Sequence, residues 1–357
     1  MSLINIPIKY ENEINIENAG VLLAPLGKKA FIIAGVTAFE KAGEKLAKAL
    51  NDAGTEYKTE IWKGYPTQTQ AEAYGKLASE YGADYIIGVG GGRILDLAKA
   101  ASEKAGLDVV TVPTIAATCA AWSTLSVLYT DEGKQDIYFF RKRSPILIIV
   151  DKKLLLEAPE RYIISGAADS IAKWYELNTN FNANKNDFAL RLQLAVSKVI
   201  LDLNENEYIN AYIKGSLTQE ILENTIDSNI LLAGLAGSIE GKVPYGGLAH
   251  HFYNQSTQID NPNKRLHGEV VIFGLNVQFA AEGRADDEIR AYLQRLKKLG
   301  LPVTLADLGL DNKQAVTEIA ERMSQRITDY AGSGNTLLPE LIERAIYKVD
   351  HLGKGLE

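Results

Sequence analysis

The sequence is poor in the features that build covalent or membrane frameworks. Cysteine occurs once, at Cys119, which excludes an intramolecular disulfide framework and fits a reducing compartment, so we expect a cytoplasmic protein. Apolar runs such as 85–89 and 146–150 are far shorter than the roughly 20 residues that a membrane helix needs. The amino terminus shows no positive start followed by a long apolar stretch, so we expect no secretory signal. A soluble protein without a membrane partner is predicted.

Positive charge is not in excess either. The chain has 38 Lys and Arg against 45 Asp and Glu, which gives a formal net charge of -7. Since nucleic-acid affinity depends largely on clustered Lys and Arg, we expect no nucleic-acid partner. A length of 357 residues exceeds the size at which a single hydrophobic core keeps growing. Two domains are therefore predicted.

The pattern of apolar residues in the sequence changes near residue 157. Before it, short β-rich apolar runs alternate with amphipathic stretches, which indicates βαβ units and parallel strands. The expected strands are 30–34, 57–62, 85–89, 109–112, 126–130, 136–140 and 146–150, and the expected helices are 38–50, 68–81 and 94–104. The turn-prone residues 131–134 predict a hairpin that interrupts the parallel sheet.

After residue 157, stretches of helical period prevail. They cover 165–177, 188–204, 218–236 and 266–281, with polar breaks at 178–187 and 260–263. We therefore expect an α/β domain of Rossmann-like type over residues 1–157 and an all-α domain over residues 158–357.

Three consecutive glycines stand where the strand 85–89 passes into a helix. Gly90, Gly91 and Gly92 would let the backbone approach a diphosphate, whose charge the N–H groups and dipole of the following helix attract. Adenine dinucleotides bind at such junctions. The alternative is a tight strand-to-helix turn without a ligand. Asp96 and Lys99, one helical turn apart, could hold the helix start or reach toward the ligand.

Histidine is scarce but concentrated. Three of the four histidines, His250, His251 and His267, fall within eighteen residues, which indicates metal binding or proton transfer. Helical neighbours point about 100° apart, so His250 and His251 do not easily face one ion. A turn at 261–263 would bring His267 back beside His250. Ordinary surface or core histidines are the alternative.

Several spaced motifs resemble one known family. The glycine run with Asp96 and Lys99, residues 112–118 and residues 123–133 closely resemble the glycerol dehydrogenase group of the iron-containing alcohol dehydrogenases. The resemblance runs from about residue 30 to the end. It implies an NAD(P)-binding α/β domain and a helical metal-binding domain, as in the dehydroquinate synthase-like fold, and a homo-oligomer, either a dimer or an octamer.

The resemblance also implies a divalent ion held by one aspartate and two histidines. Asp169 in the stretch 166–172, His250 and His267 match these ligands and would form the catalytic centre. Three protein ligands leave a position open, as in catalytic sites. This set suits zinc, our first expectation, or ferrous iron. By resemblance the cofactor, NAD or NADP, would contact Gly90, Gly91, Gly92, Arg93, Ile94, Asp96, Lys99, Thr114, Ile115, Ala116, Ala117, Ser123, Leu125 and Tyr129.

The substrate region departs from the family pattern. Cys119 stands where glycerol dehydrogenases carry an aspartate, so a polyol loses an acceptor and an anionic substrate loses a repulsion of about 1 to 4 kcal/mol. The stretch 118–122 resembles the hydroxycarboxylate dehydrogenase branch, which reduces 2-oxo acids. A small thiol that fills a gap is the alternative. Tyr253 replaces a family histidine, and it and His251 would relay protons, contact substrate or simply pack.

A second departure concerns the cofactor. Gly35 follows the first strand where the family commonly has an aspartate on the adenosine ribose, so NADP is permitted, although Val36–Glu40 offers no cation for its phosphate.

Two other classes of function are alternatives to a dehydrogenase. A lyase similar to 3-dehydroquinate synthase would need a basic cluster near His250 or His267 that the sequence lacks. A nucleotide-binding module that has lost its chemistry would not need Asp169 and both histidines. We predict a metal-dependent, NAD(P)-linked dehydrogenase of a small polyol or a 2-hydroxy or 2-oxo acid.

Overall fold

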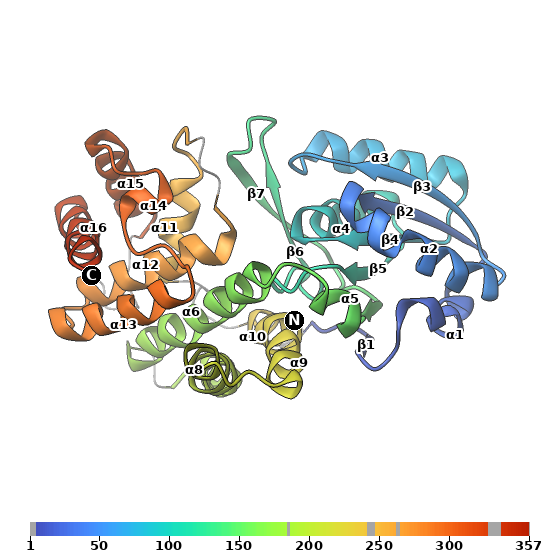
Figure 1. The fold of residues 1–357 in the computed structure, drawn as a ribbon. Coiled ribbons are helices and arrows are strands. Elements are labelled where there is room, and N and C mark those ends of the chain that lie inside the picture. The colour runs from blue at the N-terminus through green and yellow to red at the C-terminus, as the bar shows by residue number, and fades with distance from the viewer. Residues whose placement is uncertain (1–4, 184–185, 241–246, 262–264, 328–336, 357) are drawn as a thin grey trace. The chain divides into compact units, whose positions relative to one another are not determined.

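The computed structural model describes residues 5–183, 186–240, 247–261, 265–327 and 337–356. The chain divides into two compact units (Figure 1). Unit 1 comprises Met1–Ile163 and Asn229–Ser238, and unit 2 comprises Ile164–Ser228 and Ile239–Glu357. The change of unit thus falls inside helix α6 (Arg161–Ala183), a few residues after the position expected from the sequence, and a short later segment returns to unit 1.

Unit 1 is built on a six-stranded sheet in which every neighbouring pair is parallel, in the order β1-β8-β5-β4-β2-β3. The strands are β1 (Lys9–Glu11), β2 (Lys29–Gly35), β3 (Glu56–Trp62), β4 (Tyr85–Gly90), β5 (Asp108–Pro113) and β8 (Leu147–Ile149). The helical elements along them are η1 (Ile16–Asn18), α1 (Gly20–Leu23), η2 (Ala24–Leu26), α2 (Val36–Asp52), α3 (Gln68–Tyr81), α4 (Gly92–Ala105) and α5 (Lys152–Leu156). The predicted α/β fold of this part is confirmed.

The period-two pattern of β2 explains why helices cover both sheet faces. Ile32 and Ala34 belong to the core cluster that includes Leu46 of α2, whereas Phe31 and Ile33 belong to the cluster with residues of α3 and α4. Successive strand residues point to opposite faces of the sheet, so a strand whose residues are all apolar is buried on both faces. The short strand β1 carries too few apolar residues to be predicted.

The strand order places a switch point beside the glycines. The chain runs from β2 to β3 on one side and then to β4 on the other side of β2. In open α/β sheets, ligands bind beyond the carboxyl ends of the strands where the order reverses. The end of β4 and the start of α4 lie at that point, and Gly35 is the last residue of β2.

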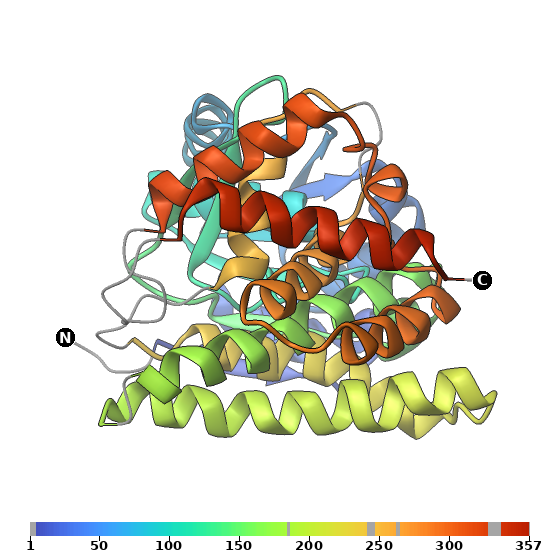
Figure 2. The ribbon, with the colours of Figure 1, turned by 90° about the vertical axis from the view of Figure 1, so that its left-hand side faces the viewer.

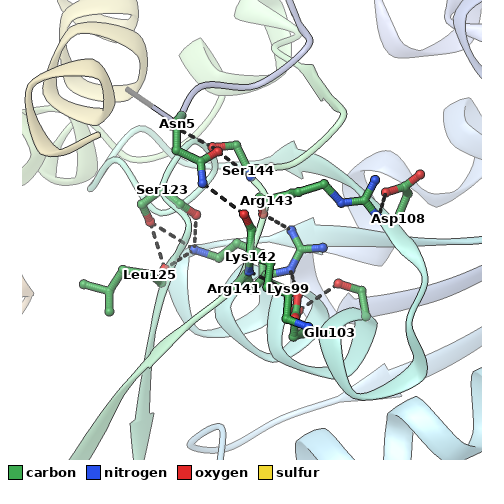
Figure 3. A network of polar contacts seen from close by, with 11 residues as sticks. Asn5, Lys99, Glu103, Asp108, Ser123, Leu125, Arg141, Lys142, Arg143 and Ser144 are labelled. Carbon is green, nitrogen blue, oxygen red and sulfur yellow. Dashed lines mark hydrogen bonds and ion pairs between the residues drawn. The ribbon is translucent and has the colours of Figure 1, made fainter. Parts of the chain in front are cut away.

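The predicted hairpin forms a separate two-stranded antiparallel sheet of β6 (Leu125–Tyr129) and β7 (Gln135–Phe140). Polar contacts attach the ends of this hairpin to α4 (Figure 3). The Lys99 ammonium donates to the carbonyl and hydroxyl oxygens of Ser123, and the Arg141 guanidinium lies 3.7 Å from Glu103. The main sheet thus stays parallel.

Unit 2 is helical, as predicted. Its further elements are α7 (Phe188–Leu201), the π-helix η3 (Asp202–Ile209), α8 (Asn210–Lys214), α9 (Gln219–Asp227), α11 (Leu248–Ser256), α12 (His267–Ala281), α13 (Asp286–Lys298), α14 (Leu305–Leu308), α15 (Lys313–Arg326) and α16 (Pro339–Lys354). The π-helix η4 (Ser228–Leu232) and α10 (Ala233–Gly237) continue from α9. Helix α12 packs against α11, α13 and α16, and α15 runs beside α16 (Figure 2). No helix of the described residues is long and apolar enough to cross a membrane.

The prediction that a polar break between helices covers residues 178–187 is wrong in part, because helix α6 continues to Ala183. The Thr179 hydroxyl lies within hydrogen-bond distance of two acceptors, the Tyr175 carbonyl oxygen one turn earlier and Glu282 Oε1, which is 2.7 Å away at the end of α12. Partners from another helix therefore satisfy polar residues that would favour a turn in isolation. Of the break expected at 260–263, residues 262 and 263 lie outside the described part.

Candidate active site

The glycine run forms a tight passage from β4 into α4. Gly90 ends the strand, Gly91 is the N-cap of α4 without a side-chain cap, and Gly92 is the first helical residue. A Cβ atom on Gly91 would lie 2.7 Å from Cδ1 of Ile115, and one on Gly90 would lie 2.8 Å from Cγ1 of Ile94. Packing therefore requires glycine here, and the same passage presents the backbone of a helix start to a diphosphate.

Asp96 and Lys99 have partners within the protein. The Lys99 ammonium is fully buried, lies 2.9 Å from Asp96 Oδ1 and donates to Ser123 and to the Leu125 carbonyl (Figure 3). These bonds fix residues 123–125 at the start of β6. Two residues expected to touch the cofactor thus shape the loop beside the glycine passage, and a direct cofactor contact stays a prediction.

The other residues expected at the cofactor lie around the same passage in unit 1. The exposed Arg93 guanidinium donates to the Gly64 carbonyl and lies over the Tyr65 ring, whose centroid is 5.4 Å from that of Tyr129. Ile94 is buried against Gly35 and Gly90. Thr114, Ile115 and Leu125 are partly exposed, as is Ser123, whereas Ala116 and Ala117 are buried.

Three polar side chains of unit 2 converge. Asp169 lies in the middle of α6, His250 in the first turn of α11 and His267 at the start of α12. Asp169 Oδ1 lies 3.2 Å from His250 Nε2 and 3.2 Å from His267 Nε2. Asp169 is 2% exposed, whereas the histidine side chains are 17% and 28% exposed. The cluster is buried on the carboxylate side and opens on the imidazole side.

Glycines let the three helices approach closely enough for this convergence. A Cβ atom on Gly268 would lie 1.8 Å from the Ser165 carbonyl oxygen of α6, and one on Gly274 would lie 2.6 Å from the Ala249 carbonyl oxygen of α11. Both neighbours are backbone atoms that cannot rotate away. His267 therefore reaches Asp169 because the next residue has no side chain.

We predict that Gly268→Ala lowers the free energy of unfolding by roughly 1 to 3 kcal/mol, because overpacking forces α12 away from α6. Thermal unfolding and zinc titration would measure the effect, and we expect zinc affinity to fall as well. Gly237→Ala is the matched control, since a Cβ atom there would meet no atom of the described residues within 4 Å and alanine favours a helix. Equal stability of Gly268→Ala and wild type would contradict this account.

Charge around the cluster is balanced by buried partners. Burial alone would raise the pKa of Asp169, but the Lys173 ammonium and both imidazoles hold it well below its usual value. Lys173 Nζ lies 3.7 Å from Asp169 Oδ1, one helical turn along α6. Burial also opposes the charged form of His250, yet the Glu176 and Asp169 carboxylates raise its pKa to about 9. Both shifts therefore favour positive charge beside the buried Asp169 and Glu176 carboxylates.

The donor set fits a divalent metal ion. The ligand atoms of Asp169, His250 and His267 all lie within 4.8 Å of one another. Bonds of about 2.0–2.1 Å at tetrahedral angles place two ligands about 3.3 Å apart, and both oxygen–nitrogen separations are 3.2 Å. Two imidazoles and one carboxylate leave a position open, as catalytic sites require.

The remaining residues expected at the site are placed differently. His251 does not belong to this cluster. Its Nδ1 is buried and has no hydrogen-bond partner among the described residues, and burial lowers its pKa. The Tyr253 ring lies edge-on against His267, with centroids 4.1 Å apart, so it packs against a candidate ligand. Cys119 lies in unit 1, partly buried, and its carbonyl accepts from the N–H groups of Trp122 and Ser123.

Two residues at the cluster were not expected from the sequence. Lys173 and Glu176 follow Asp169 by four and seven positions, so all three lie on one face of α6. The Glu176 carboxylate is 2.6 Å from His250 Nδ1. This helical spacing was the signal that could have indicated them.

The chain thus combines a parallel α/β unit, with a glycine passage at its switch point, and a helical unit with a two-histidine, one-carboxylate cluster, which are the parts of a metal-dependent dehydrogenase. Residues 9–152 match the family model described as iron-containing alcohol dehydrogenase. Hydroxycarboxylate dehydrogenase A of Escherichia coli strain K12 is 31% identical over 330 residues, 90% of this chain and 89% of that protein. Glycerol dehydrogenase of Pseudomonas putida is 30% identical over 350 residues, 95% and 94% of the two chains.

A solved structure described as a probable glycerol dehydrogenase from Sinorhizobium meliloti 1021 has a TM-score of 0.87 at 26% identity, and the match covers 100% of both chains. The chain belongs to the iron-containing alcohol dehydrogenase family. It is an NAD(P)-dependent oxidoreductase of the glycerol dehydrogenase type that acts on CH–OH groups. Membership implies NAD(P) and a divalent metal ion. The resemblance stated from the sequence is confirmed.

Proposed function

We propose that Asp169, His250 and His267 hold one divalent metal ion, zinc in preference to ferrous iron, at the catalytic centre. The observation that supports this most is the convergence of three buried or half-buried donors at ligand spacing. When bound, such an ion polarises the carbon–oxygen bond of the substrate, which hydride transfer requires. The residues of the chain fix the donors, keep Asp169 ionised and leave the imidazole side accessible.

We further propose that the substrate is a small 2-hydroxy acid, oxidised to the 2-oxo acid while NAD(P)⁺ takes up the hydride and a proton is released. Support comes from Cys119, which is neutral where an acidic residue would repel a carboxylate. The relatives include a protein named hydroxycarboxylate dehydrogenase A and proteins named glycerol dehydrogenase. A small polyol is therefore the competing substrate. By resemblance we also propose a homo-oligomer.

Either dinucleotide is compatible with the switch point. Gly35 ends β2 with no carboxylate to repel a 2′-phosphate, and Arg93 places a guanidinium at the start of α4, close to Gly64. We propose that both NAD and NADP are accepted. Each activity assay should therefore measure the rate with NAD and the rate with NADP.

The proposed function is tested by removing the metal ion with a chelator and then adding it back. We expect a chelator to abolish turnover and added zinc to restore it, because carbonyl polarisation is lost with the ion. The assay would compare 2-hydroxybutyrate, 2-oxoglutarate and glycerol with both cofactors and with zinc or ferrous iron. Full activity after complete metal removal would refute the proposed function, and a preference for glycerol would refute the proposed substrate.

A further inference from the structure

One buried carboxylate holds both the backbone and the ring of His250. Glu176 Oε1 accepts from the backbone N–H groups of Gly247, at 3.0 Å, and His250, at 2.9 Å. Glu176 Oε2 lies 2.6 Å from His250 Nδ1. Its side chain is 2% exposed, so these bonds lie away from water. Both carboxylate oxygens are thus engaged by one short segment.

The backbone bonds replace a missing helix cap. Gly247 is the N-cap of α11 and has no side chain to accept the first N–H groups of the helix. A Cβ atom at this position would lie 2.5 Å from Glu176 Cγ, so the glycine leaves the space that the glutamate fills. A carboxylate from α6 therefore caps α11, and the negative charge at a helix N-terminus is favourable.

The ring bond selects which imidazole nitrogen faces the cluster. A carboxylate accepts only, so Nδ1 of His250 must carry the proton that it shares with Glu176. Nε2, which lies 3.2 Å from Asp169 Oδ1, is then the nitrogen available to a metal ion. A ligating histidine that donates its other N–H to a carboxylate has a fixed tautomer and a more basic ligand nitrogen.

We infer that Glu176 is the positioning residue of the metal centre: it caps α11 and holds His250 with Nε2 directed at the ion. The inference rests on the proposed metal site. Glu176 is not one of the three donors that converge in the described residues. It acts through His250, so its effect should be seen first in metal affinity.

Glu176→Gln separates the two parts of this role. The amide oxygen of glutamine can still accept from the N–H groups of Gly247 and His250, while its NH₂ group would donate to Nδ1 and place the imidazole proton on Nε2. The flipped amide would keep one hydrogen bond instead of three, so the first orientation should prevail. We therefore expect a folded variant with a misdirected His250.

The experiment is a zinc titration of the metal-depleted full-length protein, with thermal unfolding in parallel. We expect the zinc dissociation constant of Glu176→Gln to rise about 10- to 100-fold, with little loss of thermal stability. Glu176→Ala should lose both affinity and stability. Asp350→Asn is the matched control, because Asp350 is a buried carboxylate of unit 2 that accepts from the Leu305 N–H. We expect its zinc affinity to equal that of wild type.

The zinc titrations distinguish a failure of the proposed role of Glu176 from a failure of the proposed metal site. If wild type binds no zinc, the proposed metal site fails. Should wild type bind zinc and Glu176→Gln bind it equally well, the metal site stands and the role of Glu176 is overturned. A purely structural cap predicts that second result, since the amide oxygen preserves the cap. An equal loss of affinity in Asp350→Asn would also overturn the inference.

Discussion

Asp169→Asn should reduce kcat by on the order of 10³-fold or more, because loss of the metal removes several kcal/mol of charge stabilisation from the reaction. The Lys173 ammonium and both imidazoles all lie within 4 Å of one oxygen of this carboxylate, Asp169 Oδ1. The amide keeps the size of the side chain but not its charge. Steady-state kinetics in parallel with metal content would measure the effect.

The control for this variant is a second buried carboxylate. Glu205→Gln removes a charge that pairs with Arg295 at 3.1 Å in unit 2 and lies outside the cluster. We expect some loss of stability but metal content close to wild type. His267→Ala should behave like Asp169→Asn. Wild-type turnover in either variant would show that the reaction does not use this cluster.

Cys119→Asp should lower kcat/KM for a 2-hydroxy or 2-oxo acid by about 5- to 1,000-fold, which corresponds to a repulsion of about 1 to 4 kcal/mol between two carboxylates. Glycerol has no charge to repel and gains a hydrogen-bond acceptor, so its kcat/KM should not fall. The ratio of the two specificity constants is the measurement, because a general loss of folding would lower both.

Cys119→Ser is the companion variant, since a hydroxyl is neutral and similar in size. We expect its preference between acid and polyol to stay within a few fold of wild type. The same loss for the acid in Cys119→Ser and Cys119→Asp would mean that charge at this position does not select the substrate. The alternative of a gap-filling thiol would then hold.

The sequence predicted unit 1 well because local pattern and tertiary environment agree there. A strand such as β4 is apolar throughout, so its burial on both faces could be inferred from the residues alone. The position of the glycine passage followed in the same way. Asp169, His250 and His267 required the family motifs, because residues 81 and 98 positions apart, respectively, in the chain meet only through helix packing.

What could not be predicted depends on contacts between elements. Thr179 extends α6 because Glu282 of another helix satisfies its hydroxyl. Lys99 was expected at the cofactor, yet its ammonium is committed to Ser123 and Leu125, which the sequence places 24 and 26 residues away. The role of Glu176 could not be predicted because its partners, Gly247 and His250, lie more than 70 residues later in the chain, at the start of α11.

The central claim is that a metal ion is held by two imidazoles and one carboxylate. X-ray absorption of the zinc-loaded protein tests it most directly, because the spectrum reports the ligand atoms themselves. We predict one zinc per chain with nitrogen and oxygen neighbours at about 2.0–2.2 Å and the scattering pattern of two imidazoles. A sulfur neighbour at about 2.3 Å, or fewer than two imidazoles, would contradict the assignment of Asp169, His250 and His267.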